Sequence, residues 1–250
     1  MLKQWSRDLA LALGFLTRLP VTSRGWPSDA ERTRALRAYP LAGLLIGLIG
    51  GIVYALALWL NLPPLIAALL ALATLMKLTG ALHEDGLADM SDALGAPVDR
   101  ARRLEIMRDS RIGTTGTLAL IVIVVLKAAA LAELAEVEEV VAALIIAAAA
   151  SRAVLPLAAF FMSPARSDGL GAGLGEPEGG VVLWACGLAV LISLLFSSFG
   201  FTFALIGLIA LYCLIFLIAM RKIFGGYTGD TMGALQQSVD LLVLLTAAAW

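Results

Sequence analysis

Long apolar stretches alternate with short polar breaks along most of the chain. A helix that crosses a bilayer needs about 20 mostly apolar residues, and seven stretches reach or approach that length. The last stretch is the least regular, because Gln236, Gln237 and Asp240 interrupt it. The pattern predicts an all-α fold, a polytopic transmembrane helical bundle of about seven spans. The predicted spans cover residues 41–60, 63–82, 112–134, 140–162, 181–199, 201–220 and 234–250.

The composition also indicates a membrane protein. Of the 250 residues, 60% are hydrophobic and 15% are charged, and the mean hydropathy is +0.93. A soluble domain is nearer half apolar and a quarter charged. The net charge of −1 gives no sign of a nucleic-acid partner, so the expected surroundings are a lipid bilayer. We expect one integral membrane domain over residues 1–250, with segment 1–40 at the cytoplasmic surface of the membrane.

Orientation follows from the basic residues, because Lys and Arg in short loops favour the cytoplasmic side. Seven spans that start from a cytoplasmic N-terminus place the turns 61–62, 135–139 and 200 outside. None of the 18 Lys and Arg residues falls in those turns, and the turn 135–139 is acidic. The sequence therefore predicts a cytoplasmic N-terminus and three longer cytoplasmic loops, 83–111, 163–180 and 221–233.

The first of these loops carries a group of carboxylates. On a helix, Asp85, Asp89 and Asp92 are spaced i, i+4 and i+7, so they share one face. Adjacent carboxylates repel one another, and a divalent cation such as Mg²⁺ or Mn²⁺ relieves the repulsion. Since Mg²⁺ usually binds one or two carboxylates together with phosphate, we predict a metal site for a diphosphate substrate. The alternative is a solvated acidic helix end that the arginines beyond it neutralise.

Two further segments supply groups that bind phosphate. Arg108, Asp109 and Arg111 precede the third span and are expected to face substrate, because the arginine fork binds phosphate in bidentate fashion. Part of that basic run is an ordinary positive-inside anchor. In loop 221–233, backbone amides near Gly226 and Thr228 would line a phosphate, although a simple hairpin between helices fits equally well.

Polar residues inside the spans are costly and usually face a cavity or a partner. Arg152 lies near the middle of the fourth span, so we expect a carboxylate or phosphate beside it. Gln237 and Asp240 continue a polar stripe into the last span. For Lys77 and Lys127, a structural ion pair and a functional role are equally well supported by the sequence.

His83 is the only histidine. A lone histidine is more often a hydrogen-bonded structural group than a catalyst. Its position two residues before Asp85 nevertheless makes it a candidate metal ligand or general base. Asp230, in the glycine-rich loop, is a candidate further metal ligand.

Six segments in this order resemble the cobalamin synthase family, the adenosylcobinamide-GDP ribazoletransferases. They include His-Glu-Asp-Gly-Leu-Ala-Asp at 83–89 and Gly-Gly-Tyr-Thr-Gly-Asp at 225–230. After Asp92 the chain departs from the usual glycine-rich turn, because residues 93–97 are shorter and more apolar, which leaves the conformation of this turn open. The six segments are 15–21, 39–43, 83–89, 103–113, 151–152 and 225–230.

The resemblance implies the last step of cobalamin nucleotide-loop assembly, in the bacterial cytoplasmic (inner) membrane. The acceptor, α-ribazole or its 5′-phosphate, attacks the phosphate on the corrinoid arm of adenosylcobinamide-GDP, and GMP leaves. Mg²⁺ is the implied cofactor. The number of metal ions, the general base, the acceptor's phosphorylation and the oligomeric state stay open. The implied roles are metal binding by Asp85, Asp89 and Asp92, a further ligand or proton acceptor among His83, Glu84 and Asp230, and charge neutralisation by Arg108, Arg111 and Arg152.

Two other classes of protein compete. A CDP-alcohol-type phosphotransferase also binds a nucleotide diphosphate through aspartates at a helix end, but its order of paired carboxylates is missing here. A small-solute transporter would use the charged residues within the spans as an ion path. Such transporters often show repeated halves with broken helices, and the sequence shows no repeat.

Overall fold

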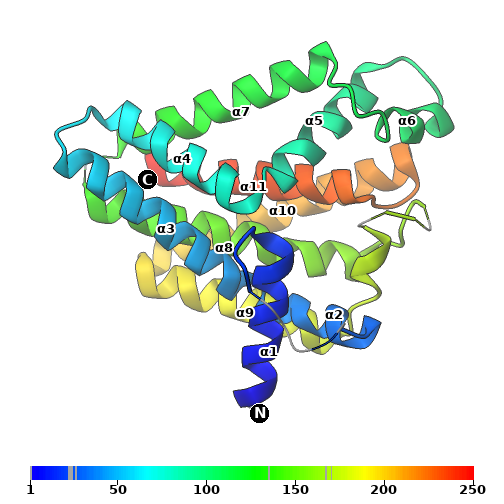
Figure 1. Ribbon diagram of the computed structural model, residues 1–250, viewed down its shortest axis with the longest axis horizontal. Helices are drawn as coiled ribbons and strands as arrows, with labels where there is room; N and C mark the ends of the chain where they lie inside the picture. Colours follow the sequence, from blue (N-terminus) through cyan, green and yellow to red (C-terminus); the bar gives the residue numbers. More distant parts are fainter. Residues whose placement is uncertain (1, 22–24, 26, 135, 167, 170) are drawn as a thin grey trace.

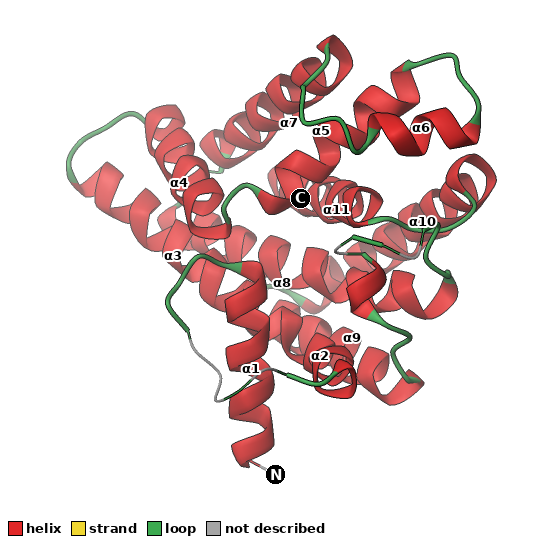
Figure 2. Ribbon diagram, turned by 45° about the vertical axis from the view of Figure 1, so that its right-hand side comes forward, coloured by secondary structure: helices red, strands yellow, loops and turns green. Residues whose placement is uncertain are grey.

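The computed structural model describes residues 2–21, 25, 27–134, 136–166, 168–169 and 171–250. Residues of segment 1–40, turn 135–139 and loop 163–180 that fall between these ranges lie outside the described part. Figure 2 shows helices and loops without a strand in the described residues. The only β-type pairing there is an isolated bridge between Pro164 and Tyr227.

Six helical stretches in the described residues are long and apolar enough to cross a membrane, and a bent pair of helices raises the number to seven. The predicted polytopic helical bundle is therefore confirmed, while the cytoplasmic position of the N-terminus stays a prediction. The six stretches are Asp29–Trp59, which joins α2 (Asp29–Ala35), η1 (Leu36–Ala38) and α3 (Tyr39–Trp59), then α7 (Thr114–Glu133), α8 (Val137–Phe161), α9 (Gly179–Phe196), α10 (Phe199–Phe224) and α11 (Gly229–Ala249).

The second predicted span, 63–82, differs from the expectation. Its helix α4 (Pro64–Thr79) has 16 residues and is followed, after a bend of 91°, by α5 (Leu82–Gly95). The bend arises because Gly80 and Ala81 both have positive φ, 69° and 55°. A positive φ costs a non-glycine residue about 1 kcal/mol, so Ala81 is a strained hinge. Helix α5 by itself is too short and too charged to cross a membrane.

Helix α8 forms the centre of the bundle and packs most extensively against α3. Gly43 and Gly47 of α3 lie four residues apart and meet the alanine-rich backbone of α8. A Cβ atom would lie 2.2 Å from the Ala148 carbonyl oxygen at Gly43, and 2.4 Å from the Leu144 carbonyl oxygen at Gly47. Small residues at this spacing let transmembrane helices approach closely, so this contact fixes the middle of the fold.

The outward faces of α7, α9 and α10 carry large apolar side chains that the protein leaves exposed. Examples are Val125 on α7, Leu183 and Leu195 on α9, and Phe199 and Ile215 on α10. Such faces suit contact with lipid rather than water.

Helix α1 (Leu2–Leu16) lies in segment 1–40, which was expected at the membrane surface. Leu16 is instead fully buried in the protein. Trp5 makes an edge-to-face contact with Trp184 of α9, with the ring centroids 5.5 Å apart. The buried Asp8 accepts hydrogen bonds from Arg34 and Arg37. A buried carboxylate needs such paired donors, so α1 is fastened to the start of the first span.

The connections between helices gather at two ends of the bundle. In Figure 1 the α3–α4, α7–α8 and α9–α10 turns lie on the left. The α8–α9 and α10–α11 connections lie on the right, together with α6 (Arg100–Ile106). This grouping matches the predicted sorting of turns into two sets, and α5 and the start of α11 bring the charged residues to the right-hand end.

Candidate active site

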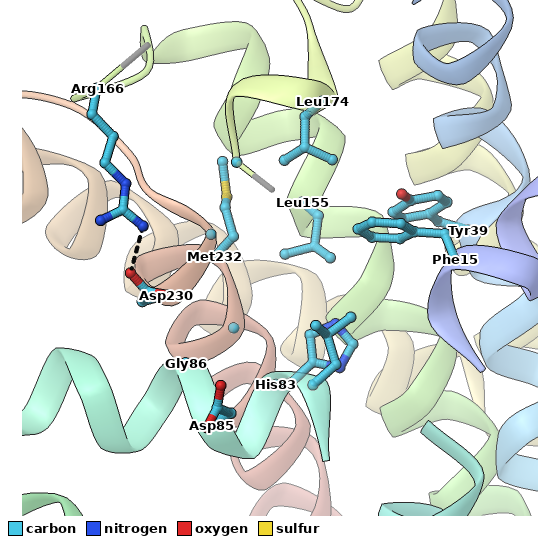
Figure 3. A pocket seen from close by; sticks show the side chains of 14 residues that line it. Phe15, Tyr39, His83, Asp85, Gly86, Leu155, Arg166, Leu174, Asp230 and Met232 are labelled. Atoms are coloured by element: carbon cyan, nitrogen blue, oxygen red, sulfur yellow. Dashed lines mark hydrogen bonds and ion pairs between the residues drawn. The ribbon is translucent and has the colours of Figure 1, made fainter. Parts of the chain in front are cut away.

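A cavity of about 180 Å³ opens where α5, α11 and the α8–α9 connection meet the end of α1. Figure 3 shows that its two sides differ: Arg166 and Asp230 lie on one side, and Phe15 and Tyr39 lie on the other. His83 and Asp85 project from α5 along the lower wall. The cavity therefore offers charged groups and an apolar surface to the same ligand.

Two glycines bring the acidic residues together. A Cβ atom on Gly86 of α5 would lie 2.9 Å from the Asp230 carbonyl oxygen and 3.2 Å from the Cα atom of Gly233 on α11. A Cβ atom on Gly233 would lie 3.0 Å from the His83 carbonyl oxygen. Because no side chain fits between these helices, α5 and α11 touch backbone to backbone. That contact places Asp85 and Asp230 on one cavity.

Asp230 stands in the first turn of α11 with two hydrogen-bond donors. Arg166 donates to its Oδ2 atom at 3.2 Å, and the Thr228 hydroxyl donates to the same atom at 3.2 Å. A carboxylate in the first turn also gains from the helix dipole. Arg166 Nη1 is buried and has no partner among the described residues, so this guanidinium has a donor that its contact with Asp230 does not use.

Asp89 lies one turn after Asp85 and is half-buried. Burial, followed by the charges of Asp85, Asp230 and Asp92, raises the pKa of Asp89 to about 7, against a weaker opposing effect of Arg166. The carboxylates are therefore close enough to repel. Among the described residues, however, no three His, Cys, Asp or Glu side chains converge as a ready-made metal site.

The carboxylate of Asp92, the third predicted metal ligand, accepts hydrogen bonds from two backbone amides. Its Oδ2 atom accepts a hydrogen bond from the Gly113 amide at 2.7 Å, and its Oδ1 atom accepts one from the Gly116 amide at 2.8 Å. These amides belong to the N-terminal end of α7, where backbone donors lack helical partners. The structure thus gives Asp92 a capping role, and metal binding by Asp92 stays a prediction.

His83 and Glu84 face different surroundings. His83 is 4% exposed and lines the cavity. Burial, with smaller effects from Arg152 and Lys127, lowers the pKa of His83 well below its usual value, so the imidazole is neutral at pH 7. Glu84 does not line this cavity, and its buried Oε2 atom has no partner among the described residues.

A buried polar network lies deeper in the bundle. Lys127 of α7 forms an ion pair with Asp240 at 2.7 Å and donates to Gln237 Oε1 at 2.6 Å. Gln237 in turn donates to Gln236, which donates to the Ser151 hydroxyl. The network occupies Lys127 and Gln237 with structural contacts, and Lys77 stays on the exposed surface of α4.

Arg152 borders this network within α8. Its Nη1 atom donates to the Ala148 carbonyl oxygen at 3.0 Å, and its Nε atom has no partner among the described residues. Asp240 and Glu84 are the opposite charges that act on it. Neither carboxylate forms a hydrogen bond or ion pair with Arg152 among the described residues, so a direct partner for Arg152 stays a prediction. Arg152 does not line the active-site cavity.

The predicted phosphate-binding arginines lie at the exposed rim. Arg108 forms a two-oxygen contact with Asp168, at 2.8 and 2.7 Å. The side chain of Arg111 is 87% exposed and pairs with Asp109. Hydrogen bonds from the side chain and the backbone amide of Arg111 lower the pKa of Asp109 to about 2. Contact of Arg108, Asp109 and Arg111 with substrate stays a prediction.

The glycine-rich loop pairs with the start of the α8–α9 connection and so positions Asp230. The Tyr227 amide donates to the Ser163 carbonyl oxygen at 3.1 Å, and the Ala165 amide donates to the Tyr227 carbonyl oxygen at 2.7 Å. A Cβ atom on Gly226 would lie 2.3 Å from the Ser163 oxygen, so this pairing requires glycine. Thr228 caps α11. Phosphate binding by Gly226 and Thr228 is not tested by these contacts.

Arg166 is a charged residue of the cavity that sequence reasoning did not select. It lies in loop 163–180, to which no chemistry was assigned, and it reaches Asp230 across 64 positions of sequence. The usable signal was its place in a predicted cytoplasmic loop as an isolated arginine. Phe15 and Tyr39 lay within segments of the resemblance, yet their shared position in the cavity is a tertiary feature.

Comparison with known proteins gives a consistent result. The sequence model described as cobalamin-5-phosphate synthase matches residues 8–248. The chain is 47% identical to the adenosylcobinamide-GDP ribazoletransferase of Bradyrhizobium diazoefficiens, covering 97% of this chain and 94% of that protein. It is 42% identical to the protein of the same name from Mesorhizobium japonicum, covering 96% and 92% of the two chains. No solved structure matches the chain.

Proposed function

The chain belongs to the cobalamin-5-phosphate synthase family, and from this we propose that it joins adenosylcobinamide-GDP to α-ribazole or its 5′-phosphate. A ribose hydroxyl oxygen of the acceptor forms a bond to the phosphorus that carries the corrinoid arm. The phosphoanhydride bond to the guanosine side breaks, GMP leaves, and the hydroxyl proton passes to a base. The observation that carries the mechanism is the cavity that unites Asp85, Asp230 and Arg166.

We propose Mg²⁺ as the cofactor of this reaction. Mg²⁺ prefers oxygen ligands and usually takes only one or two carboxylates, with phosphate and water completing its shell. The chemistry of the donors suits this cation: burial, followed by the charges of Asp85, Asp230 and Asp92, raises the pKa of Asp89 to about 7, and a cation bound among these oxygens would relieve their repulsion. When bound, the cation would neutralise charge on the diphosphate. Asp85 and Asp89 would hold it, with Asp230 as a further ligand.

Arg166 is proposed to stabilise the charge that develops on the phosphoryl oxygens. Arg166 lines the cavity, and its guanidinium carries more donors than its contact with Asp230 uses. A charge-assisted hydrogen bond aimed at the reacting phosphate lowers the barrier to phosphoryl transfer. Arg108 and Arg111 lie farther out, where they would guide the nucleotide into the site.

His83 is proposed to accept the ribose hydroxyl proton. It lines the cavity close to Asp85, where a neutral ring nitrogen can accept a hydrogen bond from the hydroxyl, while burial and the charges of Arg152 and Lys127 oppose full protonation of the ring. Asp230 is the other candidate base in contact with the cavity. Glu84 loses support for this role, because it faces the buried network instead.

The experiment is an assay of GMP release by the purified protein reconstituted in lipid. Adenosylcobinamide-GDP, α-ribazole and Mg²⁺ are supplied, and each is omitted in turn. We expect GMP and the corrinoid product only in the complete mixture, and loss of turnover in Asp230→Asn. Glu138→Gln, at the exposed start of α8, is the matched carboxylate control. GMP release without an acceptor, or turnover of CDP-diacylglycerol instead, would overturn the proposal.

A further inference from the structure

A second cavity, of about 470 Å³, adjoins the active site. It lies between α1, α2 and the start of α3, and the α8–α9 connection closes one side. Phe15, Tyr39 and Leu174 line both cavities. In Figure 3 these three residues lie across the active-site cavity from Arg166 and Asp230. The second cavity therefore continues from the apolar side of the reaction site.

The described residues that line this cavity are mostly apolar. Ala10 and Leu11 of α1 face Ala35 and Leu36, which belong to the start of the first span. Arg32 is the one charged residue among its described lining residues, and its guanidinium pairs with Asp29 at the surface. The wall has little to offer a ligand that carries many hydrogen-bonding groups.

Two aromatic rings stand at the boundary of the two cavities. Phe15 and Tyr39 are stacked, with centroids 6.2 Å apart and planes inclined by 18°. Phe15 is 40% exposed in spite of its apolar side chain. The exposed Phe15 ring, stacked on the buried Tyr39 ring beside an apolar cavity, favours contact with another flat aromatic group.

We propose that the second cavity binds the two-ring base of the acceptor nucleoside against Phe15 and Tyr39, so that the ribose extends toward the active-site cavity and its hydroxyl reaches the phosphate site. This inference rests on the proposed function. The size is within the range of about 300–1,000 Å³ that small-ligand pockets occupy. A corrinoid macrocycle with its side chains is far larger than a two-ring base and stays outside.

The polarity of the lining decides between the two bases in the reaction. A benzimidazole has no exocyclic amino or carbonyl group, so an apolar wall satisfies most of its surface. Guanine carries an amino group, a carbonyl group and ring N–H groups. In this cavity most of them would lose water without gaining a partner, which is unfavourable. The acceptor base, rather than the guanine of the donor, is therefore assigned to the second cavity.

The test fills the cavity by Ala10→Phe. Ala10 is half-buried on α1, and a phenyl ring there would occupy the space of the base. Ser6→Phe is the control, because Ser6 lies one turn earlier, is exposed and does not line the cavity. We expect the KM for α-ribazole to rise by about tenfold or more in Ala10→Phe, while the KM for adenosylcobinamide-GDP and the kcat change much less.

A competition measurement on the unaltered protein needs no variant that could misfold. Free benzimidazole should inhibit competitively against α-ribazole and not against adenosylcobinamide-GDP, whereas guanosine should not compete with α-ribazole. An unchanged KM for α-ribazole in Ala10→Phe, or a selective rise in the KM for the donor, would overturn the inference while the GMP-release assay still supports the proposed function. Absence of GMP release from the unaltered protein would instead remove the function itself.

Discussion

Gly86 of α5 and Gly233 of α11 meet without a side chain between them, and a Cβ atom on Gly86 would come within 3.2 Å of the Gly233 Cα atom. This contact determines where the acidic side chains of the two helices lie as well as how the helices pack. Asp85 and Asp89 belong to one helix and Asp230 to another, and this close approach brings the two helices together, as the proposed binding of one cation and one diphosphate requires.

Gly86→Ala should therefore lower turnover. Its methyl group would lie 2.9 Å from the Asp230 carbonyl oxygen, so the helices must separate. Overpacking of this kind costs about 1–3 kcal/mol of stability. The displacement of Asp230 should lower kcat even at temperatures at which the variant remains folded. Gly207→Ala in α10 is the control, because a Cβ atom there meets open space. Equal effects of the two substitutions on kcat would contradict the role of the glycine contact.

Asp92 should behave as a helix cap. Asp92→Ala removes both acceptors of the Gly113 and Gly116 amides and should destabilise the protein by about 1 kcal/mol, as loss of a cap does. Asp92→Asn keeps one acceptor oxygen and should lose less stability than Asp92→Ala. Thermal unfolding in detergent measures both changes. If Asp92→Asn leaves stability intact but abolishes dependence on Mg²⁺, Asp92 is a ligand and the capping role is secondary.

Much of the fold follows from the sequence because hydropathy reports burial in lipid directly. The seven apolar stretches became helices, and α5 carries its aspartates at the predicted spacing. The 91° bend before α5 was not predictable, because nothing local indicates that Ala81 adopts a positive φ. The final helix begins at Gly229, earlier than residue 234, because Thr228 caps it.

The candidate site was predicted only where its residues are near one another in sequence. Asp85 and Asp89 share a helical face, which periodicity reveals. Arg166 joins Asp230 through the packing of two loops, and periodicity gives no information on such a contact. Asp92 was grouped with the metal ligands because it shares their face, but the amides of α7 that bind it come from a different helix.

Mg²⁺ binding should weaken as the pH falls through 7. The pKa of Asp89 is about 7, so Asp89 becomes protonated and uncharged below that pH. With one competing proton, the apparent dissociation constant for Mg²⁺ should rise by about tenfold between pH 8 and pH 6. Asp89→Asn should flatten this dependence. Titration of Mg²⁺ with a fixed nucleoside diphosphate at several pH values measures it, and identical affinity at pH 6 and pH 8 would exclude the effect.

The same raised pKa determines how stability without Mg²⁺ varies with pH. The folded protein holds the Asp89 proton up to about pH 7, whereas the unfolded chain releases it near 4. Since the folded state binds more protons between those values, stability should fall as the pH rises from about 4 to 7. Addition of Mg²⁺ at pH 8 should restore part of the loss.

Arg166 should contribute more to catalysis than the exposed arginines. Arg166→Gln removes the donor that faces the proposed phosphate position and should lower kcat by about 100-fold, the size typical of one transition-state donor. Arg102→Gln is the control, because Arg102 is exposed on α6 and pairs only with Glu105 among the described residues. Comparable kcat values for the two variants would place the phosphate elsewhere.

The most direct measurement of the central claim is calorimetric titration of Mg²⁺ into detergent-solubilised protein in the presence of GDP. We compare the unaltered chain with Asp85→Asn and with Glu138→Gln. The account predicts Mg²⁺ uptake that depends on GDP, is at least about tenfold weaker in Asp85→Asn and is unchanged in Glu138→Gln. Equal Mg²⁺ affinity in all three proteins, or no uptake by a protein that still releases GMP, would contradict it.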